Sequence, residues 1–221
     1  MKTIDALNYR YCCRAFKPEQ VSKEKVQKIL EAAIRAPSWA NTQPWEIYVA
    51  SGELVERLRK AYLMNREKGV PGNPDLPRPQ SWPSALQKRI EELMSKREEV
   101  LGIARDDKAA REAMLAANYQ FFDAPVVIYL CMDRTLTPWS VFDLGLLAQS
   151  IMLAAKEHGL DTAPAVMLVS YPDLIRAELG VPDTLSIIIG IALGFGDRKN
   201  PTNKFRSPRR PLSEVMHIRG F

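Results

Sequence analysis

Apolar residues recur at two different spacings along the chain, and these spacings predict alternating helices and strands. Val26, Ile29 and Ala33 lie on one face of a helix that Ser22 would cap. Residues 126–132 form a continuous apolar run, which is typical of a strand buried on both faces. The same reasoning predicts helices over 4–11, 51–68, 84–104, 108–121, 138–158 and 171–180, and strands over 46–50, 163–170 and 186–193.

Strands flanked by longer helices in this order predict an α/β or α+β domain with a small central sheet. At 221 residues and 46% hydrophobic content, the chain can bury a sizeable core. It fits one domain, or a domain whose ends complete a partner subunit. Gly190, Gly194 and Gly196 do not predict a dinucleotide-binding site, because no helix follows the strand that carries them.

Two segments break the regular pattern. Residues 69–83 contain five prolines and two glycines, so we expect a long exposed loop there, either a lid or a linker, and Trp82 at its exit favours a lid. The tail from Gly194 is basic and rich in proline but keeps apolar residues such as Leu212 and Ile218. Such a tail would be disordered alone, and we expect its apolar side chains to pack on another surface.

Charge and cysteine content narrow the function classes. The chain has 31 Lys and Arg against 26 Asp and Glu, and the excess of +5 is spread along the sequence, so a nucleic-acid-binding stripe is not indicated. Cys12, Cys13 and Cys131 suit neither a disulfide framework nor a zinc site, which favours a reducing compartment. No apolar signal region follows Met1, and no apolar run is long enough to span a membrane. We therefore expect a soluble, cytoplasmic protein.

The sequence offers few groups for acid, base or nucleophilic catalysis. His158 and His217 are the two histidines, and neither stands in a Ser-His, Cys-His or metal-binding motif. The polar loop over 35–45 could line a pocket or be a solvated connection, and the arginines at 10 and 14 could bind an anion or lie free on the surface. Polar pocket residues without a catalytic pair are expected when a cofactor carries the reaction.

Two motifs carry a resemblance to a known family. The run R-Y-C-C-R-A-F over 10–16, and then Ala36-Pro37-Ser38 with Asn41, Gln43, Pro44 and Trp45, resemble the signature of the nitroreductase family of FMN-dependent oxidoreductases. The resemblance implies a single domain over 1–221 with a three-layer α-β-α fold of the α+β class and a central mixed, largely antiparallel sheet. It also implies a homodimer, a variable lid-like excursion over 69–107, and a tail over 195–221 that packs on the partner.

The resemblance further implies where FMN binds. Arg10, Tyr11, Cys12 and Arg14 would face the phosphate and ribityl chain, and Arg209, with Arg206, would close the phosphate. The residues Pro37, Ser38, Trp39 and Asn41 would cover the flavin from the partner subunit, and Asn118 would reach its pyrimidine edge. The ring would be bordered by Pro164, Ala165, Val166 and Met167, with a backbone N–H near Val166 directed at flavin N5. Apart from the resemblance, we hypothesise that the segment 69–83 with Trp82, together with Trp139, roofs the acceptor pocket.

Three positions depart from the family pattern: Cys12 replaces a serine, Tyr11 a basic residue, and Phe121 a lysine found in some members. The reaction implied is hydride transfer from NADH or NADPH to nitroaromatics, quinones or similar planar acceptors, in a ping-pong mechanism without metal and without a catalytic side chain. The alternatives are another flavin reaction on this fold, such as reductive dehalogenation or flavin breakdown, and a non-catalytic flavin carrier or sensor.

Overall fold

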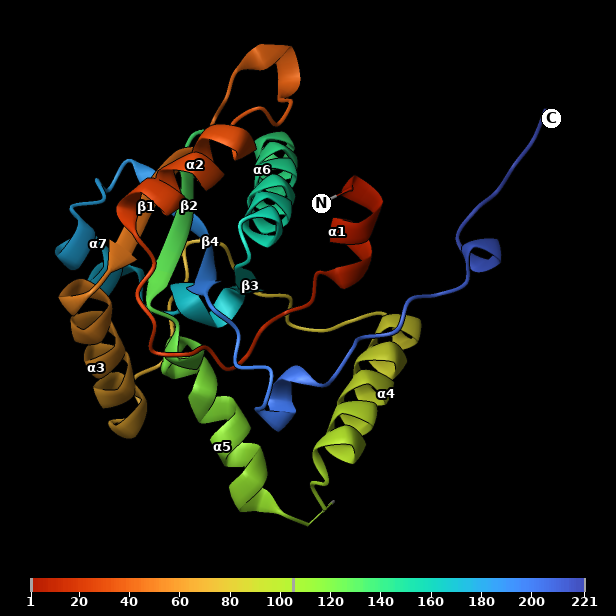
Figure 1. Ribbon diagram of the computed structural model, residues 1–221. Coiled ribbons are helices and arrows are strands. Elements are labelled where there is room, and N and C mark those ends of the chain that lie inside the picture. Colours follow the sequence, from red (N-terminus) through yellow and green to blue (C-terminus); the bar gives the residue numbers. More distant parts are fainter. Residues whose placement is uncertain (1, 105, 221) are drawn as a thin grey trace.

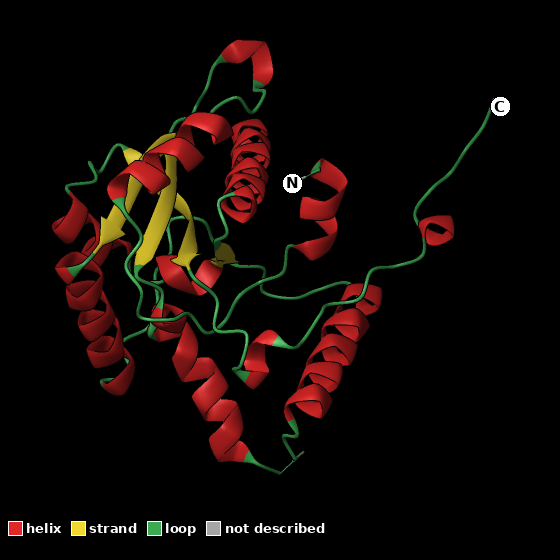
Figure 2. Cartoon of the chain, viewed as in Figure 1, coloured by secondary structure: helices red, strands yellow, loops and turns green. Residues whose placement is uncertain are grey.

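A four-stranded antiparallel sheet forms the centre of the protein, which we describe from a computed structural model over residues 2–104 and 106–220 (Figures 1 and 2). The strand order is β1-β2-β4-β3. One row of paired residues crosses the sheet through Tyr48, Tyr129, Gly190 and Ala165. The strands are β1 (Glu46–Ser51), β2 (Val126–Asp133), β3 (Asp161–Ala165) and β4 (Leu185–Gly194).

Alternating side chains of β2 divide the core into two layers. Tyr129 and Cys131 belong to one buried cluster, and Ile128 and Leu130 belong to the other. Because successive side chains of a strand point to opposite faces, the two clusters lie on opposite sides of the sheet. The first is covered by α3 (Glu53–Glu67), α5 (Lys108–Tyr119) and α7 (Pro172–Leu179), and the second by α2 (Lys23–Ala33) and α6 (Pro138–Glu157).

The expected α+β fold with three layers is therefore confirmed. Strand β2 is the buried central strand that its apolar run predicted. Ser22 caps α2 as expected, since its Oγ accepts the backbone N–H of Lys25. All four strands pair antiparallel, and among the described residues the parallel contribution is a bridge between Cys12 and Thr162 beside β3.

Two predicted boundaries are wrong. The helix predicted from residue 51 begins later, because Ser51 pairs with Val126 as the last residue of β1 and Gly52 stands at the N-cap of α3 with a positive φ of 58°. The strand predicted over 163–170 ends at Ala165 and continues as the 3-10 helix η3 (Val166–Val169). An apolar run looks the same in a buried strand and in a buried helical turn, so the hydrophobic pattern could not separate them.

Helix α6 has the length and composition of a membrane span, and among the described residues it is the one helix that does. Its apolar residues Leu144, Leu147 and Ile151 are buried in the core against the sheet and α2. It also carries the buried charged residues Asp143 and Lys156. These features identify α6 as a core helix of a globular fold.

The two irregular segments differ in how they meet the body of the protein. Residues 69–83 contain no helix or strand, as predicted, but the side chain of Asp75 is held by Arg134 and Arg176. The tail extends away from the body at its end, and helix α4 (Ser84–Leu101) stands beside its first part (Figure 1). The remaining helix, α1 (Thr3–Tyr9), packs on α6.

Candidate cofactor site

The N-terminal segment 10–16 runs in an extended conformation beside β3 and the chain that follows β4. Cys12 forms a bridge with Thr162, and the N–H of Cys13 donates to the carbonyl of Thr162 at 2.9 Å. Phe16 forms a second bridge with Gly196. These backbone contacts fix the segment that carries Arg10 and Arg14.

A buried polar cluster supports this segment from below. Lys156 Nζ lies 2.6 Å from Asp161 Oδ1, and both side chains are almost fully buried. A Cβ at Gly196 would lie 2.5 Å from Asp161 Oδ2 and 3.0 Å from the hydroxyl of Tyr11, so the close approach requires glycine. Burial raises the pKa of Tyr11 and raises the pKa of Cys13 to about 11, so both remain protonated at neutral pH.

Guanidinium groups gather around the same segment. The backbone N–H of Arg14 donates to Asn203 Oδ1 at 2.8 Å, and its Nη1 reaches the carbonyl of Cys12 at 3.4 Å. Arg206 stacks 3.8 Å from the ring centroid of Tyr11 and donates from Nη1 to the carbonyl of Asn203. The structure thus brings Tyr11, Cys12, Arg14 and Arg206 together, as the sequence motif predicted for cofactor-binding residues.

A further arginine reaches this site that the sequence did not predict. Arg97 lies on α4, and its Nε is buried without a hydrogen-bond partner. Burial, and then the positive charge of Arg14, lower the pKa of Arg97 to about 10, while Cys12 acts in the opposite direction. Nothing in the local pattern of α4 distinguishes Arg97 from its charged neighbours, because its contacts lie more than eighty residues away in the sequence.

Arg10 and Arg209 make contacts separate from those of Arg14, Arg97 and Arg206. Arg10 Nη1 lies 3.9 Å from the sulfur of Met152 on α6. Arg209 donates to the carbonyls of Ser207 and Pro208 within its own turn. Arg209 also lines a cavity of about 540 Å³ between α4 and the tail, with Arg89, Glu92, Lys96, Arg210 and Glu214.

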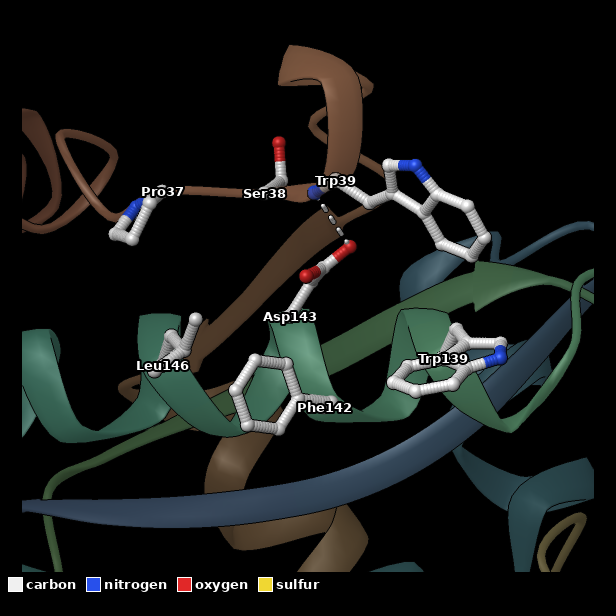
Figure 3. A pocket seen from close by; sticks show the side chains of 7 residues that line it. All are labelled: Pro37, Ser38, Trp39, Trp139, Phe142, Asp143 and Leu146. Atoms are coloured by element: carbon white, nitrogen blue, oxygen red, sulfur yellow. Dashed lines mark hydrogen bonds between the residues drawn. The ribbon is translucent and has the colours of Figure 1, made fainter. Parts of the chain in front are cut away.

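An apolar pocket of about 540 Å³ forms where the polar loop meets the start of α6 (Figure 3). The rings of Trp39 and Trp139 meet edge to face at 5.7 Å, and Phe142 lies beside them. The buried carboxylate of Asp143 accepts the backbone N–H of Trp39 at 3.3 Å. The full lining is Pro37, Ser38, Trp39, Trp139, Phe142, Asp143 and Leu146.

The backbone of this loop is strained. Ala40, Asn41 and Gln43 have positive φ values of 48°, 57° and 47°. Residues other than glycine rarely adopt this conformation, and such strain clusters at binding sites. Ser38 Oγ accepts the backbone N–H of Gln43 at 2.9 Å, which stabilises the turn.

The remaining predicted residues take varied places. Asn118 donates to the carbonyls of Met114 and Leu115 in its own helix. Pro164 and Ala165 pair with β4, while Val166 at the start of η3 is exposed and Met167 is half-buried. Trp82 is exposed and does not line the pocket that contains Trp139. Phe121 is fully buried against Tyr62 and so does not face a pocket.

One chain holds the two halves of the predicted site on opposite sides of α6. Arg10 contacts α6 at Met152, whereas the loop contacts it at Asp143, nine residues earlier. Nine residues span about two and a half turns, so the two contacts face opposite directions and lie about 13 Å apart along the axis. Figure 1 shows the loop after α2 at one end of the sheet and the segment after α1 toward the other.

Known proteins share this fold and these motifs. The sequence profile of the Nitroreductase family matches residues 7–195. Nitrobenzene nitroreductase from Ectopseudomonas oleovorans is 37% identical over 214 residues, covering 95% of this chain and 93% of its own. Nitroreductase NfnB from Mycolicibacterium smegmatis is 35% identical over 211 residues, covering 95% of this chain and 89% of its own.

A solved structure agrees with this assignment. The FMN- and NADPH-dependent nitroreductase NfnB from Sphigopyxis sp. strain HMH superposes with a TM-score of 0.94 at 34% identity, and all of both chains is covered. The fold and the motifs define an α+β protein of the flavin-dependent oxidoreductase type. This chain belongs to the nitroreductase family.

Proposed function

We propose that the protein is an FMN-dependent oxidoreductase that takes hydride from NADPH or NADH and reduces nitroaromatic compounds, quinones or similar planar acceptors. The observation that carries the proposal is the group of Arg14, Arg97 and Arg206 around Cys12, because guanidinium groups match phosphate oxygens in geometry and charge. The names of the relatives favour nitroaromatic acceptors over dehalogenation or flavin breakdown.

The residues present fit the FMN phosphate. A buried guanidinium N–H without a partner is costly unless an acceptor binds to it, and Arg97 Nε is such a group. The formal charge of a phosphate monoester, about −2, suits two or three neighbouring arginines. In this proposal Arg10, Tyr11, Cys12 and Arg14 hold the phosphate and ribityl chain, and Arg206 and Arg209 close it from the tail.

Bound FMN supplies the electron-pair chemistry for which the protein offers no acid, base or nucleophile pair. The protein binds and orients the flavin and excludes water around it. In this proposal residues 164–167 would border the ring and offer a backbone N–H near Val166, and Asn118 would turn from its own helix toward the pyrimidine edge. These fixed donors stabilise negative charge without titrating, because oriented dipoles need little reorganisation.

The aromatic pocket is the proposed place for the planar acceptor and the nicotinamide in turn. Trp39, Trp139 and Phe142 give flat apolar faces, which suit stacking of aromatic rings. Pro37, Ser38 and Asn41 cover the flavin of the partner subunit, so the proposal includes a homodimer with shared sites. Trp82 does not line this pocket, so the proposed roof is Trp139 together with Trp39. The proposed compartment is the cytoplasm, where NADPH and NADH are available.

A spectrum of the purified protein and an anaerobic stopped-flow experiment test the proposal. We expect non-covalent FMN, bleaching of its absorbance by NADPH or NADH, and reoxidation by nitrobenzene or a quinone in a separate second step. The solved relative is named NADPH-dependent, so both nucleotides are compared. Flavin that neither nucleotide bleaches would contradict the oxidoreductase and support a carrier or sensor.

A further inference from the structure

Helix α4 carries a partly buried arginine whose environment is unfavourable in the absence of an anion. Arg97 sits in the second half of α4, and its Nε has no hydrogen-bond partner. The positive charge of Arg14 acts on it directly and, after burial, is the next largest cause that lowers the pKa of Arg97 to about 10. The side chain of Arg97 remains charged at neutral pH. The positive charges of Arg97 and Arg14 are therefore close together in a partly desolvated environment.

The packing of α4 fixes the direction of this side chain. Glu98 Oε1 lies 2.9 Å from Arg111 Nε on α5, which orients α4 about its axis. Helix α4 also contacts η4 (Pro201–Asn203). Asn203 is buried there and accepts the backbone N–H of Arg14 while its own Nδ2 donates to the carbonyl of Ala15. Arg97 lies near enough to Cys12 and Arg14 for both to act on its pKa.

We propose that Arg97 is a phosphate ligand supplied by α4, which binds the 5′-phosphate of FMN together with Arg14. This inference rests on the proposed function. It gives the excursion over 69–107 a role in cofactor binding, because its helix supplies one of the phosphate ligands. The chemistry recognised is a phosphate monoester dianion, for which the planar guanidinium offers two parallel N–H donors.

Two phosphate monoesters are available to such a site, the 5′-phosphate of FMN and the 2′-phosphate of NADPH. Riboflavin is FMN without its phosphate, and NADH is NADPH without its 2′-phosphate. Comparing the members of each pair therefore separates the two ligands. The charge group around Cys12 lies within the predicted FMN motif, which favours FMN.

The experiment measures flavin binding to the flavin-free Arg97→Met variant by fluorescence titration. We expect the FMN dissociation constant to rise by about tenfold to a hundredfold, the range for a lost hydrogen bond to a charged group. Riboflavin binding should not change. The midpoint of thermal unfolding of the flavin-free variant should stay equal or rise, because an unpaired buried charge is removed. Lys88→Met is the matched control, since Lys88 is exposed nine residues earlier on the opposite side of α4.

Four outcomes would overturn the inference. Equal weakening of FMN and riboflavin, or a lower unfolding midpoint of the flavin-free variant, would show that Arg97 is structural. Loss of the NADPH-over-NADH preference with unchanged FMN affinity would place the nicotinamide phosphate there. If the variant binds FMN like the wild type, the inference about Arg97 is wrong but the proposed function stands. A wild-type protein that does not bind FMN would refute the proposed function itself.

Discussion

The three cysteines differ in their surroundings although two of them are neighbours in sequence. Cys13 and Cys131 are fully buried, and Cys12 is partly exposed beside Arg14. Burial raises the pKa of Cys13 to about 11 and that of Cys131 to about 12. The thiolate is the reactive form, so both buried thiols should be inert at pH 8.

A thiol titration of the flavin-free protein with an aromatic disulfide reagent tests this difference. We expect one thiol per chain to react rapidly under native conditions and all three to react in denaturant. Cys12→Ser should remove the rapid reaction, and added FMN should slow it in the wild type, because the proposed phosphate site covers Cys12. Rapid reaction of two or more thiols would show that the segment 10–16 is not held as described.

At the residue scale, local signals predicted Ser22 as a cap and the arginines of the motif, but not Arg97. A cap depends on three or four neighbouring residues, which the sequence displays together. The role of Arg97 depends on Arg14 and η4, which the fold brings to it from both ends of the chain. No pattern of neighbouring residues in a single sequence indicates a contact between such distant segments.

At the scale of elements, the loop 69–83 is less free than its composition suggests. Asp75 Oδ1 lies 2.8 Å from Arg134 Nη2, and Oδ2 lies 2.7 Å from Arg176 Nη2. Oδ2 also accepts the backbone N–H of Ile187 at 2.8 Å, on β4. Burial acts to raise the pKa of Asp75, but the hydrogen bonds from Arg176, Ile187 and Arg134 outweigh it and lower the pKa. The loop is therefore fixed to the sheet at Asp75, and Arg78 adds a second anchor by donating to Ser170 Oγ at 2.7 Å.

Asp75→Asn should reduce the free energy of unfolding at pH 7 by about 2 to 3 kcal/mol, because Arg176 loses its buried partner charge. A carboxylate with a lowered folded pKa stabilises above its unfolded pKa of about 3.9, and the stabilisation is lost as the pH falls through the folded value. Urea unfolding of both proteins should therefore show a gap at pH 7 that narrows below about pH 4. Glu99→Gln, at an exposed carboxylate of α4, is the control. A gap of the same size at the lowest pH would show that the charge of Asp75 is not its source.

The elements that periodicity predicted well are those with long, uninterrupted patterns, such as α2, α6 and β2. The elements that periodicity missed are turns of the chain formed by residues that do not usually form turns. Phe121, Phe122 and Asp123 take positive φ values of 55°, 57° and 61° in succession after α5. Tertiary packing imposes this turn, since Phe121 and Phe122 are buried in the core and Phe122 accepts the N–H of Phe16.

At the scale of the whole molecule, a single chain leaves apolar side chains exposed to solvent. Leu212, Val215, Met216 and Ile218 of the tail are 42% to 65% exposed. The aromatic pocket and Arg10 also meet α6 on opposite sides. The sequence predicted both groups of residues but could not show that one chain keeps them apart. That separation is what a site shared between two chains requires, because a second copy can place its loop beside the arginines of the first.

Mixing two defective variants tests the shared site directly. Chain one carries Arg10→Glu, which opposes the phosphate, and chain two carries Ser38→Ala, Trp39→Ala and Asn41→Ala in the loop. If each site takes its arginines from one chain and its loop from the other, a heterodimer has one intact site and one doubly defective site. Random pairing of equal amounts makes about half of the dimers mixed, so about one quarter of all sites should be intact.

We expect co-expression of the two chains to restore about a quarter of the wild-type FMN content and NADPH-dependent rate, while each variant alone has little of either. The control chain carries all four substitutions together and is co-expressed with the wild type. It should again leave about a quarter of the sites intact if random pairing holds, since only wild-type homodimers are then complete. Two tags and sequential purification isolate the heterodimers, in which the intact fraction should be about half for the first pair and near zero for the control. The result would be reversed if the arginines and the loop of one chain served the same site. The purified heterodimer of the two defective chains would then have no intact site, and the control heterodimer would have one.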